Sequence, residues 1–332
     1  MTMKTRILIC LGALLAVAAV DSVKNHLEIP KAKVNVKVMD EQGNPVPGAG
    51  VSLVFKNPLS ATPMQVKGIS NAEGCFSAEG GADAAGIGCD IQKEGYYRGT
   101  APIPVFHDID ATLNRWTPWN ETYTSVLRLV GNPVALYVKS EKTSIPVLDR
   151  PCGYDMEKGD WVAPQGKGIK ADLVFTVHRD FKDWLDFTVE AQVSFPQPLD
   201  GLVQFTPPAV GQHSIFRWER FAPEIGFSAP HLVRFANHDP RSGKASEITF
   251  DTAKRDRGYF FRVRTVAQNG QIVSANYGKI YGDIAIDPRE SKTCWISFTY
   301  YLNPASLDRN LEWDTKHNLI QGLSWEQTPR EP

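Results

Sequence analysis

The residue types best suited to chemistry gather in one acidic stretch, where Asp180, Asp183 and Asp186 recur every three residues and His178 lies just before them. On a helical turn this spacing would place the carboxylates on one side, as oxygen ligands for calcium or as the carboxylate pair of a glycoside hydrolase. The acidic residues also alternate with large aromatic ones, which is typical of an amphipathic turn with a solvated acidic face. We favour the second interpretation, because the spacing of a calcium-binding EF-hand loop is absent.

A hydrolase would need a further carboxylate, and Glu219 and Glu312 are the candidate partners of the acidic stretch. The sequence contains no Gly-x-Ser-x-Gly elbow, no His-Glu-x-x-His pattern, no Walker loop and no dinucleotide fingerprint. Its seven histidines include no His-x-His or i,i+4 pair, so we expect hydrogen-bonded or surface histidines rather than metal ligands. The sequence therefore predicts no catalytic residue, no cofactor and no metal site.

Three large aromatic residues, Trp116, Trp119 and Tyr123, lie in the stretch Arg98–Tyr123. If exposed, their flat faces would form a ligand platform that stacks on sugar rings. If buried, they would join this part of the chain to the next, which is the commoner fate of large aromatic side chains. Both alternatives stay open, and the first makes carbohydrate a candidate ligand.

Four cysteines remain if the N-terminal segment that holds Cys10 is removed: Cys75, Cys89, Cys152 and Cys294. An even number in an exported chain is typical of two disulfides, although three pairings are compatible with four cysteines. We favour Cys75–Cys89 within the first domain and Cys152–Cys294 across the second. Four unpaired thiols are the alternative, because the cysteine spacing forms no motif.

Residues 1–20 are typical of a secretory signal peptide, since Lys4 and Arg6 precede the apolar run Ile7–Val20 and small residues lead to Asp21. The run is short for a membrane span, and no later segment is apolar and long enough to cross a bilayer. A retained N-terminal anchor is the alternative to cleavage near residues 18–21. We expect an exported protein, either periplasmic or extracellular.

The composition predicts an all-β fold of two domains. The chain of 332 residues can bury two cores, and its 23 prolines and 26 glycines suit many short strands joined by turns. Lys and Arg total 36 against 37 Asp and Glu, so no net field attracts nucleic acid. We expect a tether at 21–32, a β-sandwich at 33–130, a connection at 131–150 and a second, larger β-sandwich or jelly roll at 151–327.

The first domain opens on Val34, Val36 and Val38, whose alternation with polar residues predicts a half-buried strand. A Gly-Asn-Pro turn follows, and the alternation resumes at Val51–Phe55. Further strands are expected at 64–69, 75–78, 89–92 and 124–130.

This pattern resembles the carboxypeptidase regulatory-like domain, a transthyretin-like β-sandwich common in bacterial exported proteins. The resemblance covers about residues 33–130, with Arg98–Tyr123 longer than the usual link to the last strand. It implies a folding partner or spacer without catalytic residues of its own. The residues that carry it are Val34–Val38 with Asp40, Gly43-Asn44-Pro45-Val46-Pro47-Gly48-Ala49 with Val51, Asn71-Ala72-Glu73-Gly74 before Phe76, Glu94-Gly95-Tyr96, and Leu127-Arg128-Leu129.

The second domain is expected to be mostly β, with strands at 172–177, 187–195, 248–250, 259–268 and 294–302. Asn269-Gly270 is a strong signal for a two-residue hairpin turn. A helix is predicted at Pro304–Trp313, with Asn303 as its cap.

These features favour an exported, non-enzymatic envelope or extracellular protein, with a binding or structural role such as carbohydrate or surface adhesion. One alternative is a glycan- or envelope-directed hydrolase with its site in the second domain. Another is a subunit that holds a peptide at a free sheet edge. The expected partners are carbohydrate or another envelope protein and not nucleic acid, and we expect no membrane span after signal cleavage.

Overall fold

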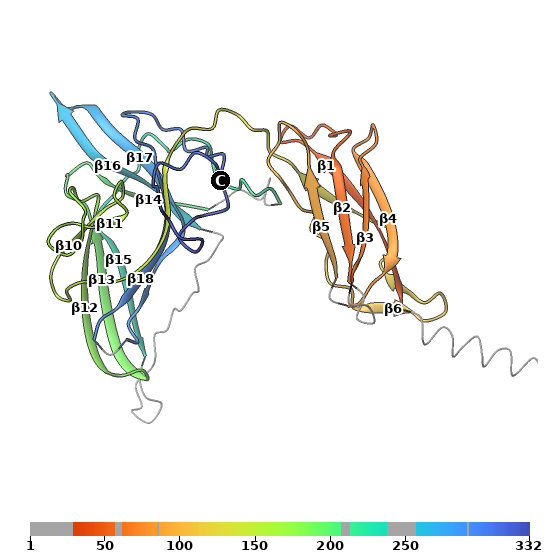
Figure 1. Cartoon of the computed structure of the whole chain (residues 1–332), viewed down its shortest axis with the longest axis horizontal. Coiled ribbons are helices and arrows are strands. Elements are labelled where there is room, and N and C mark those ends of the chain that lie inside the picture. Colours follow the sequence, from red (N-terminus) through yellow and green to blue (C-terminus); the bar gives the residue numbers. More distant parts are fainter. Residues whose placement is uncertain (1–28, 57–61, 85, 207–212, 238–256, 291) are drawn as a thin grey trace, which may run out of the picture. The chain divides into compact units, whose positions relative to one another are not determined.

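The computed structural model describes residues 29–56, 62–84, 86–206, 213–237, 257–290 and 292–332 (Figure 1). Within these ranges the chain forms strands, turns and loops and no helix, so the fold is all-β as the sequence predicted. The chain divides into two compact units. The first comprises Met1–Val130 with Ala209–Arg217, and the second comprises Gly131–Pro208 with Trp218–Pro332.

The first unit contains two sheets. In the five-stranded sheet, β1 pairs with β4 in antiparallel and with β7 and β8 in parallel orientation, and β6 pairs with β7. The smaller sheet has the order β3-β2-β5. The strands are β1 (Lys31–Met39), β2 (Gly50–Phe55), β3 (Met64–Ile69), β4 (Cys75–Gly81), β5 (Ile87–Gln92), β6 (Asp108–Asp110), β7 (Arg115–Thr117) and β8 (Glu121–Val126).

The alternating residues of β1 and β2 form the core between these sheets. Val34 and Val36 of β1 and Leu53 and Phe55 of β2 have no exposed surface, and they belong to one buried cluster. Burying one face of each sheet is what the period-2 pattern predicted. At the turn before β4, Gly74 has φ of +76°, and a Cβ there would lie 2.4 Å from a backbone oxygen, so the turn requires glycine.

The second unit also contains two sheets, each of five strands, in the orders β11-β10-β12-β13-β15 and β14-β16-β17-β18-β9. The strands are β9 (Tyr137–Ser144), β10 (Cys152–Asp155), β11 (Asp160–Trp161), β12 (Leu173–Asp183), β13 (Asp186–Ser194), β14 (Gly201–Phe205), β15 (His231–Asn237), β16 (Gly258–Gln268), β17 (Gln271–Asp287) and β18 (Trp295–Leu302). All neighbouring pairs are antiparallel.

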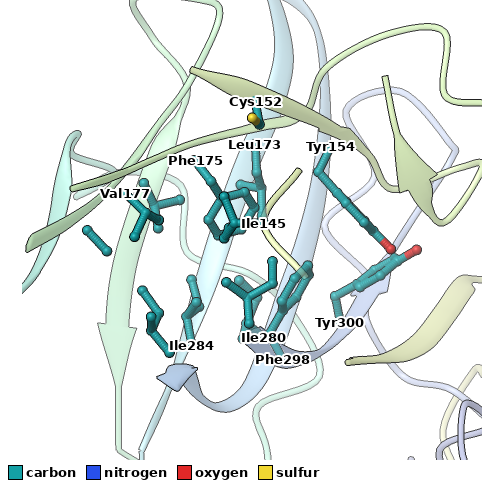
Figure 2. Packing of buried hydrophobic residues seen from close by; sticks show 14 of the residues in the cluster. Ile145, Cys152, Tyr154, Leu173, Phe175, Val177, Ile280, Ile284, Phe298 and Tyr300 are labelled. Carbon is teal, nitrogen blue, oxygen red and sulfur yellow. The ribbon is translucent and has the colours of Figure 1, made fainter. Parts of the chain in front are cut away.

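One apolar cluster joins the two sheets of the second unit. Figure 2 shows Leu173 and Phe175 of β12 packed near Ile280 of β17 and Phe298 of β18, and all four are at least 97% buried. Because the inner faces of both sheets supply this cluster, the unit is a two-layer β-sandwich.

Three local predictions meet different outcomes. The Asn269-Gly270 hairpin between β16 and β17 is confirmed, with both residues at positive φ. The helix predicted at Pro304–Trp313 is wrong, because Asn303 bonds the nearby backbone at Ala305 N (2.8 Å) and Asn310 O (2.8 Å), and an irregular turn forms instead. The stretch expected as a connection at 131–150 contains β9, which pairs with β18 at the edge of a sheet.

Several expectations fall outside the described residues. They are the signal peptide at 1–20, most of the tether at 21–32 and the strand at 248–250. Among the residues that the structure describes, no helix has the length and apolar character needed to span a membrane.

Candidate functional site

The acidic stretch forms the hairpin between β12 and β13 and not a helical turn. Asp183 Oδ1 accepts hydrogen bonds from Leu185 N (2.7 Å) and Asp186 N (3.1 Å), which closes the turn. Lys182 Nζ donates to Asp186 Oδ2 at 2.7 Å. Asp183 and Asp186 therefore stabilise a tight turn at the end of the sheet, and His178 pairs separately with Asp149 through Nδ1 (2.5 Å).

The further carboxylates proposed for a hydrolase lie elsewhere in the second unit. Glu312 is 1% exposed and accepts backbone hydrogen bonds from Gly131 N (2.7 Å) and Asn132 N (3.1 Å). Arg220 Nε lies 3.4 Å from the same carboxylate. Glu312 thus anchors a loop, whereas Glu219 is exposed. Among the described residues, no group of three or more His, Cys, Asp or Glu side chains is placed to hold a metal ion.

The three aromatic residues do not form an exposed platform. Trp116 is 6% exposed, stacks on Phe106 and donates its Nε1 hydrogen to Ala82 O at 2.8 Å. Tyr123 is 9% exposed in the same core. Trp119 is half-buried, with Arg115 5.1 Å from its ring centroid. Trp116 and Tyr123 are buried as the alternative expected, but they pack in the core of their own unit and not as a junction to the next part of the chain.

All four cysteines that the structure describes are free thiols, so the pairs Cys75–Cys89 and Cys152–Cys294 are not formed. Cys75 lies in β4 and Cys89 in β5, which belong to different sheets. Cys152 directs its Sγ to Val147 O (3.5 Å) instead of another sulfur. Burial raises the pKa of the half-buried Cys89 and of the buried Cys294 to about 11, as expected for structural thiols.

Asp155 organises the loop between β10 and β12. Its Oδ1 accepts from Glu157 N (3.0 Å) and Lys158 N (3.1 Å), and its Oδ2 accepts from Ile169 N (2.8 Å) and Lys170 N (3.1 Å). Burial of the carboxyl opposes ionisation, but these donors and a nearby arginine outweigh burial and lower the pKa of Asp155.

The nearby arginine is Arg264, which lies in a bulge of β16 at φ of +59°. It forms two hydrogen bonds to Asp172, from Nε (2.6 Å) and Nη2 (2.9 Å), and a third to Glu157. Asp172 has no exposed surface. The guanidinium of Arg264 thus pairs with the carboxylates of Asp155, Glu157 and Asp172. These ion pairs connect β16 to β10 and to the start of β12, which is a structural role.

A second buried group lies in the same unit. Lys139 Nζ donates to Glu141 Oε2 (2.7 Å) and Gly159 O (2.6 Å), and the Tyr154 hydroxyl donates to Glu141. Tyr154 and Tyr300 lie with their hydroxyl ends close together (Figure 2). Burial raises the pKa of Tyr154, so its hydroxyl stays protonated as a donor.

The geometry most suited to binding is the edge of the small sheet of the first unit. Beyond β5, Gly99 continues the sheet through mutual hydrogen bonds with Ile91 (2.9 and 3.0 Å). Ser214 then pairs with Gly99: Thr100 N donates to His213 O (2.7 Å), and Ile215 N donates to Arg98 O (2.9 Å). His213–Phe216, which we call the added segment, thus pairs with the sheet edge through a short antiparallel bridge at Ser214.

Close approach at this edge depends on glycine. A Cβ at Gly99 would lie 2.5 Å from Leu127 Cδ2 and 3.2 Å from His213 O. Ser214 opposite is 2% exposed, and its Oγ accepts from Phe216 N at 3.2 Å. The missing side chain at Gly99 is therefore what allows the added segment to reach the sheet.

Phe216 anchors the added segment. It has no exposed surface and stacks on Tyr97, with ring centroids 4.8 Å apart and an interplanar angle of 30°. The guanidinium of Arg128 lies 4.6 Å from the Phe216 ring centroid, and its Nη1 donates to Phe216 O at 3.4 Å. Arg128 is held in turn by Glu41, through Nε to Oε1 at 2.8 Å. Main-chain pairing and one aromatic anchor together make this edge the strand-acceptor site.

Sequence reasoning missed the strand-acceptor site. The available signal was Ser214-Ile215-Phe216, a short run of β-prone and apolar residues, which can indicate a strand but not its partner. That partner lies more than a hundred residues earlier in the chain, at Arg98–Thr100.

No known family model matches the chain, and no curated protein does. Among solved structures, it is similar to a hydroxyquinol 1,2-dioxygenase from Pseudomonas putida, with 16% identity, a TM-score of 0.24 and coverage of 31% of this chain and 58% of that one. A catechol 1,2-dioxygenase from an Acinetobacter species, inhibited by bound mercury, has 14% identity, a TM-score of 0.21 and coverage of 32% and 54%. The chain thus spans little more than half of these dioxygenases.

A third similar structure is a DUF3823 family protein from Parabacteroides merdae. It has 12% identity and a TM-score of 0.18, and the match covers 75% of this chain and 96% of that one. Scores this low carry no argument about the activity of the present chain. The resemblance to carboxypeptidase regulatory-like domains is matched by no family model.

Proposed function

We propose that this chain is an exported, non-enzymatic binding or scaffold protein of the cell envelope or its surroundings, in which the first unit works by adding an extended segment to a sheet edge. The observation that carries the proposal is the strand-acceptor site, where main-chain hydrogen bonds and the buried Phe216 hold a segment from far along the chain. Strand addition is a binding mode that needs no catalytic group.

The fate of the candidate carboxylates supports the same proposal. Of these candidates, Asp183 closes a turn and Glu312 binds two backbone N–H groups. A general acid or base needs a lone pair or proton directed toward a substrate, and these carboxylates direct theirs into the fold. The carboxypeptidase regulatory-like resemblance of residues 33–130 agrees with a spacer or binding module, and the signal peptide at 1–20 agrees with export.

Carbohydrate is the second candidate ligand, because Trp184 is 64% exposed at the end of the β12–β13 hairpin. An indole face of this kind stacks on the apolar face of a sugar ring. Trp184 therefore replaces Trp116, Trp119 and Tyr123 as the candidate contact for a sugar ring.

A glycan array combined with an assay for reducing-end release tests these proposals. We expect no release of reducing ends from any glycan, for the wild type and for Asp183→Asn alike. Release that the Asp183→Asn variant abolishes would overturn the non-enzymatic proposal in favour of the hydrolase. Carbohydrate is supported as the ligand if the wild type binds to the array and Trp184→Ala does not. The control is Trp325→Ala, which replaces a different indole that is 74% exposed and should leave this binding unchanged.

A further inference from the structure

The strand-acceptor site contacts the main chain and side chains of four consecutive residues, His213–Phe216. His213 O and Ile215 N make the main-chain bonds, Ser214 fits against Gly99, and Phe216 stacks on Tyr97. The required chemistry is therefore a short peptide with a small residue that pairs with Gly99, followed two positions later by an aromatic ring.

The added segment belongs to the first unit but is separated in the sequence from the rest of that unit. Pro208 before it and Trp218 after it are assigned to the second unit, whereas Ala209–Arg217 is assigned to the first. The acceptor residues, Tyr97–Thr100 and Arg128, are separated from it by long stretches of chain. The bonds at the site are thus long-range contacts made by a short insertion.

We propose that the strand-acceptor site also binds the added segment of a second copy of this chain, so that two copies form a dimer by exchanging His213–Phe216. A second copy supplies the same four residues, so the exchanged pair keeps each main-chain bond and the contacts of Phe216 with Tyr97 and Arg128. Exchange of an identical element is a low-cost route to a dimer. This inference goes beyond the proposed non-enzymatic function. The glycan assays test that function separately from the dimer.

Concentration decides between the closed monomer and the exchanged dimer. A segment in the same chain competes at an effective concentration of about a millimolar, so exchange is favoured when the protein refolds at comparable concentration. Protein refolded at high concentration is expected to contain roughly tenfold more dimer than protein refolded a hundredfold more dilute.

Two single-cysteine chains test the exchange directly. One full-length chain carries Thr100→Cys and the other His213→Cys, both in a background in which alanine replaces Cys10, Cys75, Cys89, Cys152 and Cys294, so that each chain holds one thiol. Thr100 and His213 are neighbours across the added strand, with 2.7 Å between Thr100 N and His213 O. After joint refolding and mild oxidation, we expect a disulfide-linked heterodimer on a non-reducing gel, because this disulfide can form only between chains.

The control is one chain with both Thr100→Cys and His213→Cys, which must form the internal disulfide when refolded in dilute solution. If it does so while the mixed single-cysteine chains give no heterodimer at any concentration, the exchange is excluded. A heterodimer that persists undiminished when Phe216→Ala is added to both chains would also overturn the proposal, because the aromatic anchor would then play no part.

Discussion

Phe216 is the buried aromatic side chain of the added segment at the strand-acceptor site. It is fully buried, against Tyr97 and Arg128. Replacing it with alanine removes a buried ring and leaves a cavity, and substitutions of this kind cost about 3–5 kcal/mol. We expect Phe216→Ala to lower the free energy of unfolding of the first unit by this amount in urea titrations monitored by circular dichroism.

The matched control for this experiment is Phe221→Ala, because Phe221 is 57% exposed and lies five residues further along the chain. Substitutions at such positions change stability by about 0.5 kcal/mol or less. Equal losses for the two variants would contradict the assignment of Phe216 as an anchor.

The four thiols are expected to react with iodoacetamide at different rates. Burial raises the pKa of Cys89 and Cys294 to about 11, so at pH 8 on the order of one such thiol in a thousand is the reactive thiolate. Cys75 is partly exposed, so we expect it to be labelled first in the native protein. Mass spectrometry of peptides gives the order, and a Cys75 that reacts only after reduction would instead indicate a disulfide.

At the scale of elements, the loop between β10 and β12 depends on the charge of Asp155. Asparagine in its place would present an amide group to two of the four backbone N–H donors. Leaving such donors unsatisfied costs about 1–3 kcal/mol, so we expect Asp155→Asn to unfold at lower urea concentration near neutral pH.

The pKa of Asp155 also gives this difference a pH dependence. Because the folded-state pKa lies below the ordinary value of 3.8, the stabilisation is complete above that value and is lost as the pH falls through the lowered pKa. The stabilities of the wild type and Asp155→Asn should therefore converge as the pH falls from 3.8 through the lowered pKa of Asp155. A stability difference that stays constant down to pH 2 would show that the carboxylate charge is not its source.

Local patterns in the sequence predict the strands of this protein better than their partners. The alternation of Val34, Val36 and Val38 fixes which face of β1 is buried, and Asn269-Gly270 fixes a hairpin, because both signals act over a few residues. The helix predicted at Pro304–Trp313 fails because polar side chains such as Asn303 bond the backbone there and replace helical bonds.

The candidate site was harder to predict for a physical reason. Trp116 and Tyr123 look like ligand-binding aromatics in the sequence, but the sheet around β1 buries them. Phe216 lies in a short apolar run that does not indicate its partner, since its role comes from pairing between Ser214 and Gly99 over a long sequence separation. Burial and long-range pairing are properties of the folded chain, which composition and spacing do not encode.

At the scale of the whole molecule, the first unit is not one continuous stretch of chain, because it includes Ala209–Arg217. A chain of residues 29–130 would keep β1–β8 but lose the added segment that covers Gly99 and Tyr97. We expect this shortened chain to be less stable than the first unit of the full protein, with a lower Tm in calorimetry.

A synthetic peptide of residues 209–219 should restore part of the lost stability, since a ligand that binds only the folded state stabilises it by mass action. At ten times its Kd the peptide adds about 1.4 kcal/mol, which raises the Tm of a domain of this size by about 5–10 °C. The same peptide with Phe216→Ala is the control and should raise the Tm by far less, because it lacks the ring that stacks on Tyr97. Equal shifts with both peptides would mean that main-chain pairing alone holds the segment and that the aromatic contact contributes nothing.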